Sequence, residues 1–426
     1  MEKYGQALLI AIPCFLVLIL IEIIYGAIIR KDQLNNMDII SSLSSGMTNI
    51  LKDTLGLTIV VISYPFLLSK IAIFHGDKHP VLMAILAFVI MDFGGYWYHR
   101  FTHTINYFWN LHIVHHSSEE YNLPCALRQQ FSVFTNLPNI FFQGILMAVF
   151  GVPFEIYAII APVHLFLQFW YHTRYIDKMG FLEYVLVTPS HHRVHHAMND
   201  IYMDKNFSQI FIIWDKLFGT FQVELDEIPP VYGVRRPVRT WNPFLINLRH
   251  LWLLITDTVR TKSIKDKIAV WFMPTGWRPA DVTEKYPVFY IKNMNELQKY
   301  NPVYSTAFKV WSNIQLVFVF FLLIYLFTQF GKLPMNLVMQ NGLFILLSIF
   351  AFTSLMDKSS IGLMAEWLRF LIGAYIIVST GDWFGINAYI SSGSWFILGY
   401  LLIAAIVSSY FYFKEFKPEN KTALAV

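Results

Sequence analysis

Long apolar runs separated by short polar stretches recur along the whole chain and predict membrane helices. The first run, residues 7–29, is interrupted only by Glu22 and is long enough to cross a hydrocarbon core. Eight further runs follow, at residues 55–74, 80–91, 138–150, 154–171, 314–330, 342–356, 361–378 and 395–413. The pattern predicts an all-α, polytopic integral membrane protein with about nine membrane-embedded helices.

A short break between the fourth and fifth apolar runs predicts that the chain turns back there. Gly151 and Pro153 lie between them, which predicts a helical hairpin or a re-entrant pair. Such a pair returns the chain at His172 to the side of the membrane on which the third helix ends at His99.

Composition agrees with a membrane protein and excludes several other classes. Hydrophobic residues make up 56% of the chain, charged residues make up 14%, and the mean hydropathy is +0.47. The net charge of +4 comes without a dense basic run, so we expect no nucleic-acid partner. Cys14 and Cys125 are the only cysteines, which supports neither a disulfide framework nor a thiolate metal site.

The distribution of basic residues sets the expected orientation. Residues 176–302 contain no long apolar run, and eight Lys and Arg residues gather between Arg235 and Lys267, which places this segment in the cytoplasm. The host would be a bacterial inner membrane or the endoplasmic reticulum. The expected segments are N-terminal membrane helices (1–90), a histidine-motif domain (91–234), a cytoplasmic cap segment (235–305), and C-terminal membrane helices with the tail (306–426).

Eight histidines between Tyr98 and Asp215 form three motifs, one H-x-x-x-H and two H-x-x-H-H. Residues three and four apart share a helix face, so each motif is expected to turn its imidazoles towards a common point. Neutral imidazole suits transition metals, and eight ligands exceed the four that one structural zinc takes, so two ions are expected. The eight are His99, His103, His112, His115, His116, His192, His195 and His196.

Two ions held by histidine favour oxygen chemistry on a lipid. Breaking an unactivated C–H bond needs an oxidant stronger than any side chain, and iron with dioxygen supplies one. Two-zinc hydrolysis competes, but such sites usually include carboxylates, and no Asp or Glu lies inside a histidine motif. A transition-metal transporter or sensor without turnover is the alternative from another class, and its ligands would follow a path across the bilayer.

Five stretches carry a family resemblance: YWYHRFTH, HIVHHSSEEYNLPCALRQ, FWYHT, TPSHHRVHH and DKNFSQIFIIWDKLFGTF. Together they resemble the fatty acid hydroxylase and sterol desaturase superfamily of membrane di-iron enzymes, over roughly residues 91–234, and within it the alkylglycerol monooxygenase branch. This resemblance implies hydroxylation beside the ether oxygen of an alkylglycerol, giving a hemiacetal that separates into fatty aldehyde and glycerol backbone. A sterol, a carotenoid or a fatty acyl chain is the alternative substrate.

The resemblance also implies roles for particular residues. Two iron ions would be held by the eight motif histidines and by His172 as a ninth ligand. Asn206 and Asp215 match the closing motif and would tether the segment after the last ligands. His191 adjoins His192 and would point about 100° away from it on a helix. Asp92, two turns before His99, is a candidate to orient a ligand ring.

The electron donor must be external, because the chain carries no flavin, haem or nicotinamide motif. The alkylglycerol enzymes place a glutamate directly after the second histidine of the first motif, where this chain has Thr104. If that glutamate serves a reduced pterin, Thr104 counts against pterin dependence. A ferredoxin or a cytochrome is the alternative donor.

Overall fold

The computed structural model describes residues 2–30, 34–74, 79–131, 138, 140–294 and 297–416, and the side chains of 2–7 and 53–63 are outside this description. All regular elements of the described residues are helices; these residues form no β-strand, only two isolated β-bridges, Leu186 to Phe211 and Ala197 to Tyr232. Contacts divide the chain into two units, each described separately below.

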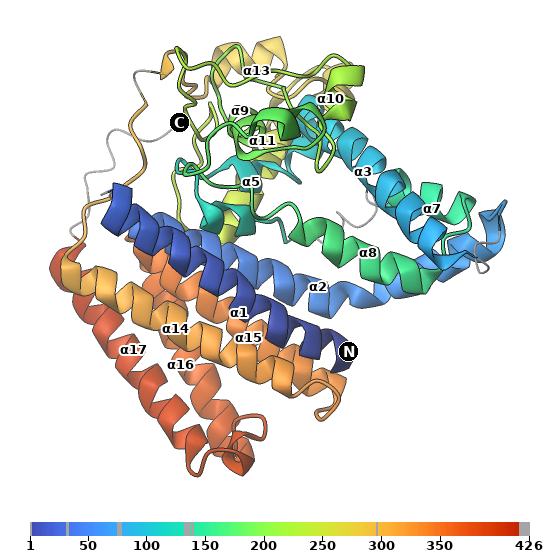
Figure 1. Ribbon diagram of the computed structural model, residues 1–426. Helices are drawn as coiled ribbons and strands as arrows, with labels where there is room; N and C mark the ends of the chain where they lie inside the picture. Colours follow the sequence, from blue (N-terminus) through green and yellow to red (C-terminus); the bar gives the residue numbers. More distant parts are fainter. Residues whose placement is uncertain are drawn as a thin grey trace. The chain divides into compact units, whose positions relative to one another are not determined.

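The first unit comprises residues 1–55, 239–246 and 300–425. Four long apolar helices follow one another in its C-terminal part, and each contacts the next (Figure 1). Helix α1 (Glu2–Tyr25) lies beside the first of them. The four are α14 (Thr306–Thr328), α15 (Met335–Met356), α16 (Ser360–Thr380) and α17 (Gly393–Glu415).

A buried ion pair joins the helices of this bundle. Glu366 and Arg369, three residues apart on the same face of α16, form a fully buried ion pair at 2.7 Å. Gln315 of α14 donates a hydrogen bond to Glu366 (2.9 Å) and accepts one from Arg369 (2.9 Å). The pair therefore fixes the register of α16 against α14.

The second unit comprises residues 56–238 and 247–299, and it contains all nine expected metal-ligating histidines. The longest helix that lies wholly in the second unit is α3 (Pro80–Thr104), and three apolar elements pack against it (Figure 1). They are the π-helix η5 (Ile140–Gly144), α7 (Ile145–Val149) and α8 (Phe154–Phe166). Gly94 permits the close approach of η5, because an added Cβ would clash with the carbonyl oxygen of Phe142.

Short helices joined by irregular segments complete the second unit. Helix α2 (Asn36–Ile71) and helix α11 (Pro243–Arg260) each have residues in both units. The remaining elements are α4 (Asn106–Trp109), α5 (Ile113–His116), η3 (Leu123–Leu127), η6 (Gly180–Tyr184), α9 (Pro189–His195), α10 (Ile213–Leu217), α12 (Ile264–Phe272) and α13 (Ala280–Lys285).

Six helices of the described chain are long and apolar enough to cross a membrane, which confirms a helical membrane protein. They include the N-terminal helix, α3 and the four C-terminal helices. Two of the other expected runs form the shorter apolar helices Ile140–Val149 and Phe154–Phe166, and residues 55–71 form the second half of α2. Length and composition thus identify six candidate spans among the described residues.

Candidate metal centre

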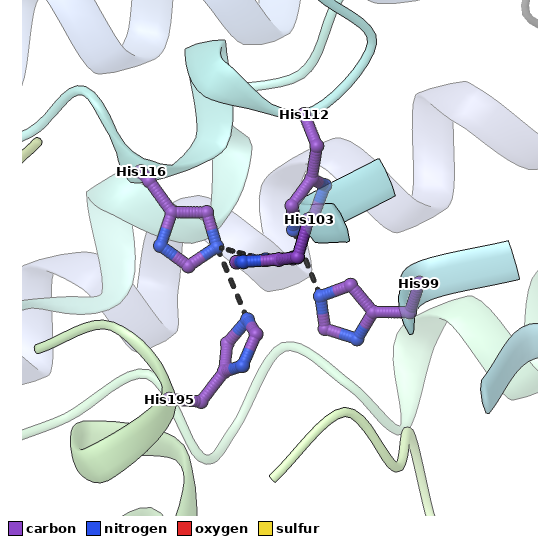
Figure 2. Close-up of side chains that lie close together, drawn as sticks. All are labelled: His99, His103, His112, His116 and His195. Atoms are coloured by element: carbon purple, nitrogen blue, oxygen red, sulfur yellow. Dashed lines mark hydrogen bonds between the residues drawn. The ribbon is translucent and has the colours of Figure 1, made fainter. Parts of the chain in front are cut away.

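Five of the histidines converge on one point from three separate segments (Figure 2). Their ligand atoms all lie within 4.8 Å of one another. The closest approaches join Nε2 atoms, at 2.8 Å between His99 and His112 and at 3.1 Å from His116 to each of His103 and His195. We call this set, His99, His103, His112, His116 and His195, the first group.

Four more histidines form the second group, again with ligand atoms within 4.8 Å. The Nε2 atom of His172 lies 3.2 Å from that of His115 and 2.9 Å from that of His192, and His196 lies 3.0 Å from His192. His172 follows α8 and is the one member from outside the three motifs. The second group is His115, His172, His192 and His196.

The two groups adjoin each other. The rings of His116 and His196 stack with centroids 4.3 Å apart, and those of His192 and His195 stack at 5.2 Å. Each of these contacts joins a first-group ring to a second-group ring. Two ions held by these groups would therefore be neighbours in one centre.

Each H-x-x-H-H motif serves both groups, which differs from the expectation that each motif converges on a single point. His112 and His116 enter the first group, and His115 between them enters the second. Residues four apart differ by about 40° around a helix, whereas adjacent residues differ by about 100°. The i, i+4 pair therefore points to one group and the third histidine to the other, and the motif at 192–196 repeats this arrangement in reverse.

Backbone carbonyls fix the tautomer of four rings. A carbonyl oxygen can only accept, so a ring nitrogen facing it must carry the proton. The facing atom is Nδ1 in every case: His99 to Phe207 (2.7 Å), His115 to Arg128 (3.2 Å), His172 to Gln168 (2.9 Å) and His195 to Lys205 (3.0 Å). Each Nε2 is thereby left with a free lone pair directed into its group.

These lone pairs fit a bound cation. His115 and His172 both use Nδ1 as donor, so their Nε2 lone pairs face each other across 3.2 Å. Two nitrogens held about 2.1 Å from one ion at right angles lie about 3.0 Å apart. A transition-metal ion bound between the rings would convert this lone-pair repulsion into coordination.

Burial keeps the imidazoles outside α3 in the neutral form that metals require. Burial, reinforced by neighbouring imidazoles, lowers the pKa of His115 to about 3. The same causes lower the pKa of the other six well below the ordinary histidine value. The six are His112, His116, His172, His192, His195 and His196.

The expected tethers form an outer layer around the first group. The Asp215 carboxylate accepts hydrogen bonds from the backbone N–H groups of Phe207 (2.8 Å) and Ser208 (2.7 Å), and Phe207 in turn receives the Nδ1 proton of His99. Asn206 adopts φ +54° and bonds the His191 carbonyl and the Gln222 backbone. Both side chains shape the loop that follows the third motif.

Replacing Asp215 by asparagine is expected to weaken metal binding without removing a ligand. One carboxylate oxygen becomes an NH2 group that opposes a backbone N–H, which loosens the Phe207 carbonyl and with it His99. Changes of this kind typically cost about 10- to 100-fold in metal affinity or activity. Metal titration with a competing chelator measures the change. Asp226→Asn, at an exposed carboxylate, is the matched control, and its metal affinity should equal that of wild type.

Asp92 supports the centre at a distance from the rings. Its carboxylate accepts hydrogen bonds from the N–H groups of Ile210 and Phe211 and from Trp214 Nε1, and lies 3.1 Å from His164 Nε2. These described partners belong to α8 and to the segment after the third motif, so Asp92 ties that segment to α3 instead of orienting a ligand ring. His164 is thus a partner of Asp92.

His191 lies outside both groups, as its position beside His192 predicts. Its ring is buried, and the ring centroid lies 5.4 Å from that of Phe221. Its Nδ1 atom has no hydrogen-bond partner among the described residues. Burial lowers the pKa of His191 to about 4. The neighbouring Arg193 is also structural, because it forms an ion pair with Glu224 at 2.7 Å.

Several supporting groups carry no signal in the sequence. Four are the backbone carbonyls above, which have no residue type to recognise. Asp204, in a left-handed conformation, places its carboxylate 3.7 Å from His103 Nδ1. Trp109 packs on His103 at 5.2 Å, and Tyr171 on His192 at 4.3 Å.

An apolar hollow of about 450 Å³ lies at the end of α3. Its lining includes Phe101, Ile105, Phe108 and Phe142. Phe101 lies between His99 and His103 in sequence but on the other face of α3, so the hollow does not open directly on the rings. Phe108 is adjacent in sequence to Trp109, which packs on the first group.

Comparisons with known proteins locate the histidines within one family domain. The Fatty acid hydroxylase family profile matches residues 84–220, a range that includes all nine histidines. Alkylglycerol monooxygenase of Homo sapiens is 32% identical over 368 residues, covering 85% of this chain and 80% of that protein. Alkylglycerol monooxygenase of Danio rerio is 33% identical over 376 residues, covering 84% and 79% respectively.

A more distant relative acts on another lipid. Ornithine lipid hydroxylase OlsE of Rhizobium tropici is 30% identical over 149 residues, covering 35% of this chain and 44% of that protein. No solved structure matches the chain.

Proposed function

Because this chain belongs to the alkylglycerol monooxygenase family, we propose that it cleaves the ether bond of alkylglycerols within a membrane. The chain is a membrane oxidoreductase with a fatty acid hydroxylase domain. In the proposed reaction, O2, two electrons and two protons convert the ether-linked CH2 group into CH(OH) and release water. The hemiacetal then separates into a fatty aldehyde and a glycerol backbone. The observation that carries the proposal is the paired histidine groups with inward Nε2 lone pairs.

We propose that each group holds one iron ion. Bound iron would supply, with O2, the oxidising power that no side chain has. The protein's contribution is to present neutral imidazoles in fixed orientations. The carbonyls of Phe207 and Lys205 do this for the first group, and those of Arg128 and Gln168 for the second.

Aromatic side chains around the rings would exclude water from the centre. Trp109 and Phe207 pack on His103 at 5.2 and 5.3 Å, and Tyr171 packs on His192. A dry site limits hydrolysis and wasteful reduction of oxygen. We propose that the apolar hollow at Phe101 and Phe108 accommodates part of the alkyl chain.

The proposed topology places the centre at the cytoplasmic surface of a bacterial inner membrane or of the endoplasmic reticulum. In this arrangement the second half of α2, the η5–α7 segment and α8 are also embedded in the membrane, giving nine helices. The cap segment, residues 235–305, would lie on the same side because of its basic residues.

We propose an external electron donor, with a ferredoxin- or cytochrome-type protein favoured over a reduced pterin. Thr104 ends α3, and its hydroxyl donates to the Arg100 carbonyl of the same helix at 2.9 Å. That hydroxyl offers no negative charge to a pterin. A Thr104→Glu variant restores the carboxylate and tests whether it alone confers use of reduced pterin.

Product analysis tests the proposed reaction. Purified protein loaded with iron and supplied with a labelled alkylglycerol, oxygen and a chemical reductant should release labelled fatty aldehyde, detected by mass spectrometry. Parallel reactions contain reduced pterin or reduced ferredoxin, with Thr104→Glu as the matched variant. Oxidation of a sterol, carotenoid or fatty acyl chain in place of the ether lipid would contradict the substrate. One tightly held zinc with no oxygen uptake would contradict enzymatic function.

A further inference from the structure

Helix α11 exposes a stripe of apolar side chains. Four apolar side chains at spacings of four, three and four residues form one stripe on its exposed surface. Their exposed fractions are far above those of core residues. The stripe consists of Leu248 (47% exposed), Trp252 (67%), Ile255 (37%) and Val259 (73%).

The inward side of the same helix is mixed, because Ile246, Leu253 and Leu254 are buried there together with polar residues. Asn247, His250 and Asp257 are all buried. His250 lies 3.1 Å from the Asn106 carbonyl oxygen, and Asp257 forms an ion pair with Arg278 at 2.6 Å. A surface helix in water buries its apolar side and exposes its polar side, whereas α11 exposes a continuous apolar stripe and buries the charged Asp257. The orientation of α11 therefore indicates an apolar environment outside the protein.

Helix α12 also exposes an apolar stripe. Ile264, Ile268 and Phe272, each four residues after the last, are 78%, 63% and 68% exposed. Single exposed apolar residues are ordinary on proteins, but two consecutive helices with continuous exposed stripes mark an interaction surface.

Both helices are attached to the end of a candidate membrane span. Asn106 follows the span Pro80–Thr104 by two residues. Its side-chain amide donates to the carbonyls of Val270 (3.0 Å) and Trp277 (2.9 Å), and its backbone N–H donates to Met273 (3.0 Å). The end of a span lies at the membrane surface, so α11 and α12 are held at that depth.

Basic residues accompany the stripes. Arg249, Arg260, Lys262 and Lys265 are exposed on or beside the two helices. An apolar stripe with adjacent basic side chains suits a leaflet of anionic lipids, in which the stripe enters the acyl boundary and the cations meet the headgroups. A second copy of the chain fits less well, because it would bring like charges together.

We propose that α11 and α12 form an interfacial anchor, defined by the stripes Leu248 to Val259 and Ile264 to Phe272, that lies in an anionic membrane leaflet. The sequence predicts a cytoplasmic cap segment at residues 235–305, and the anchor adds contact of that segment with the lipid leaflet. The anchor would hold the end of α3, and with it His99 and His103, at a fixed depth relative to lipid substrates.

Spin labels on the full-length protein in lipid nanodiscs test the anchor. Trp252→Cys and Ile268→Cys are labelled in a Cys14→Ala background, where Cys125 is buried. For each label, the collision rate with oxygen is divided by the collision rate with a water-soluble nickel chelate. In discs containing anionic lipid, this ratio should be several-fold higher at Trp252→Cys and Ile268→Cys than at Asp226→Cys, which marks an exposed aqueous position. Adding Lys262→Glu and Lys265→Glu should reduce this ratio in anionic discs more than in neutral ones.

Two results would overturn the proposal. The first is a ratio at Trp252→Cys and Ile268→Cys equal to that at Asp226→Cys, which would place the stripes in water. The second is spin–spin broadening that depends on protein content per disc, which would assign the stripes to a second copy. Neither readout depends on turnover, so failure of the anchor is distinguishable from failure of the proposed function.

Discussion

Replacing His115 by glutamine should remove the ion of the second group, whereas replacing its neighbour His116 should remove the ion of the first. The two residues adjoin in sequence but their rings belong to different groups. Each variant should therefore retain about one iron per chain, and the remaining iron should differ between them in its spectroscopic signature. If one ion used the whole motif, the two variants would behave alike.

Activity should be lost in both variants. An ion that stabilises developing charge or generates the oxidant contributes several kcal/mol, and about 4 kcal/mol corresponds to about a thousand-fold in rate. We expect aldehyde release to fall by at least about that factor. Iron is counted by elemental analysis, and its two environments are resolved by Mössbauer spectroscopy of iron-57-loaded protein.

His191→Gln is the matched control, since His191 belongs to the same cluster of motifs but its ring faces Phe221. This variant should keep about two irons per chain. Loss of one ion in His191→Gln would contradict the assignment of the groups, as would two irons retained in either His115→Gln or His116→Gln.

Sequence reasoning identified the ligand candidates because their signal is local. Spacings of three and four residues and the residue type itself were enough to single out the motif histidines, and the resemblance added His172. The division between the two groups could not be predicted from spacing alone, since it depends on where the opposing helices place their own rings. His195 joins the first group only because α9 faces α3 and α5 there.

Interactions between distant segments account for the remaining differences. Asp92 has the right helical position to support His99, yet its partners come from α8 and from residues 210–214, more than seventy residues away. The outward stripe of α11 has ordinary amphipathic periodicity in sequence. Which side faces outward is decided by the polar contacts of His250 and Asp257 with other segments.

The metal-free protein should lose stability steeply as the pH falls below about 6.5. Seven histidines of the two groups lie outside α3, and burial lowers the pKa of each in the folded state, to about 3 for His115. In the unfolded chain they titrate near 6.5. Between those values the unfolded state binds more protons than the folded state, so the free energy of unfolding decreases as the pH decreases.

For each such histidine, the free energy of unfolding falls by up to about 1.4 kcal/mol per pH unit of acidification within this window. Several histidines together therefore have a larger effect than most substitutions. Thermal melting of chelator-treated protein in detergent, from pH 7.5 to 5.0, measures the slope. A His115→Gln, His192→Gln variant removes two of the titrating rings and should show a shallower acid slope, whatever its melting temperature at pH 7.5. Iron should raise stability most near neutral pH, because protons compete with the metal for the same Nε2 lone pairs. A melting temperature that stays constant down to pH 5 would mean that these imidazoles are already protonated or solvated in the folded protein, and neither state is compatible with two groups of neutral ligands.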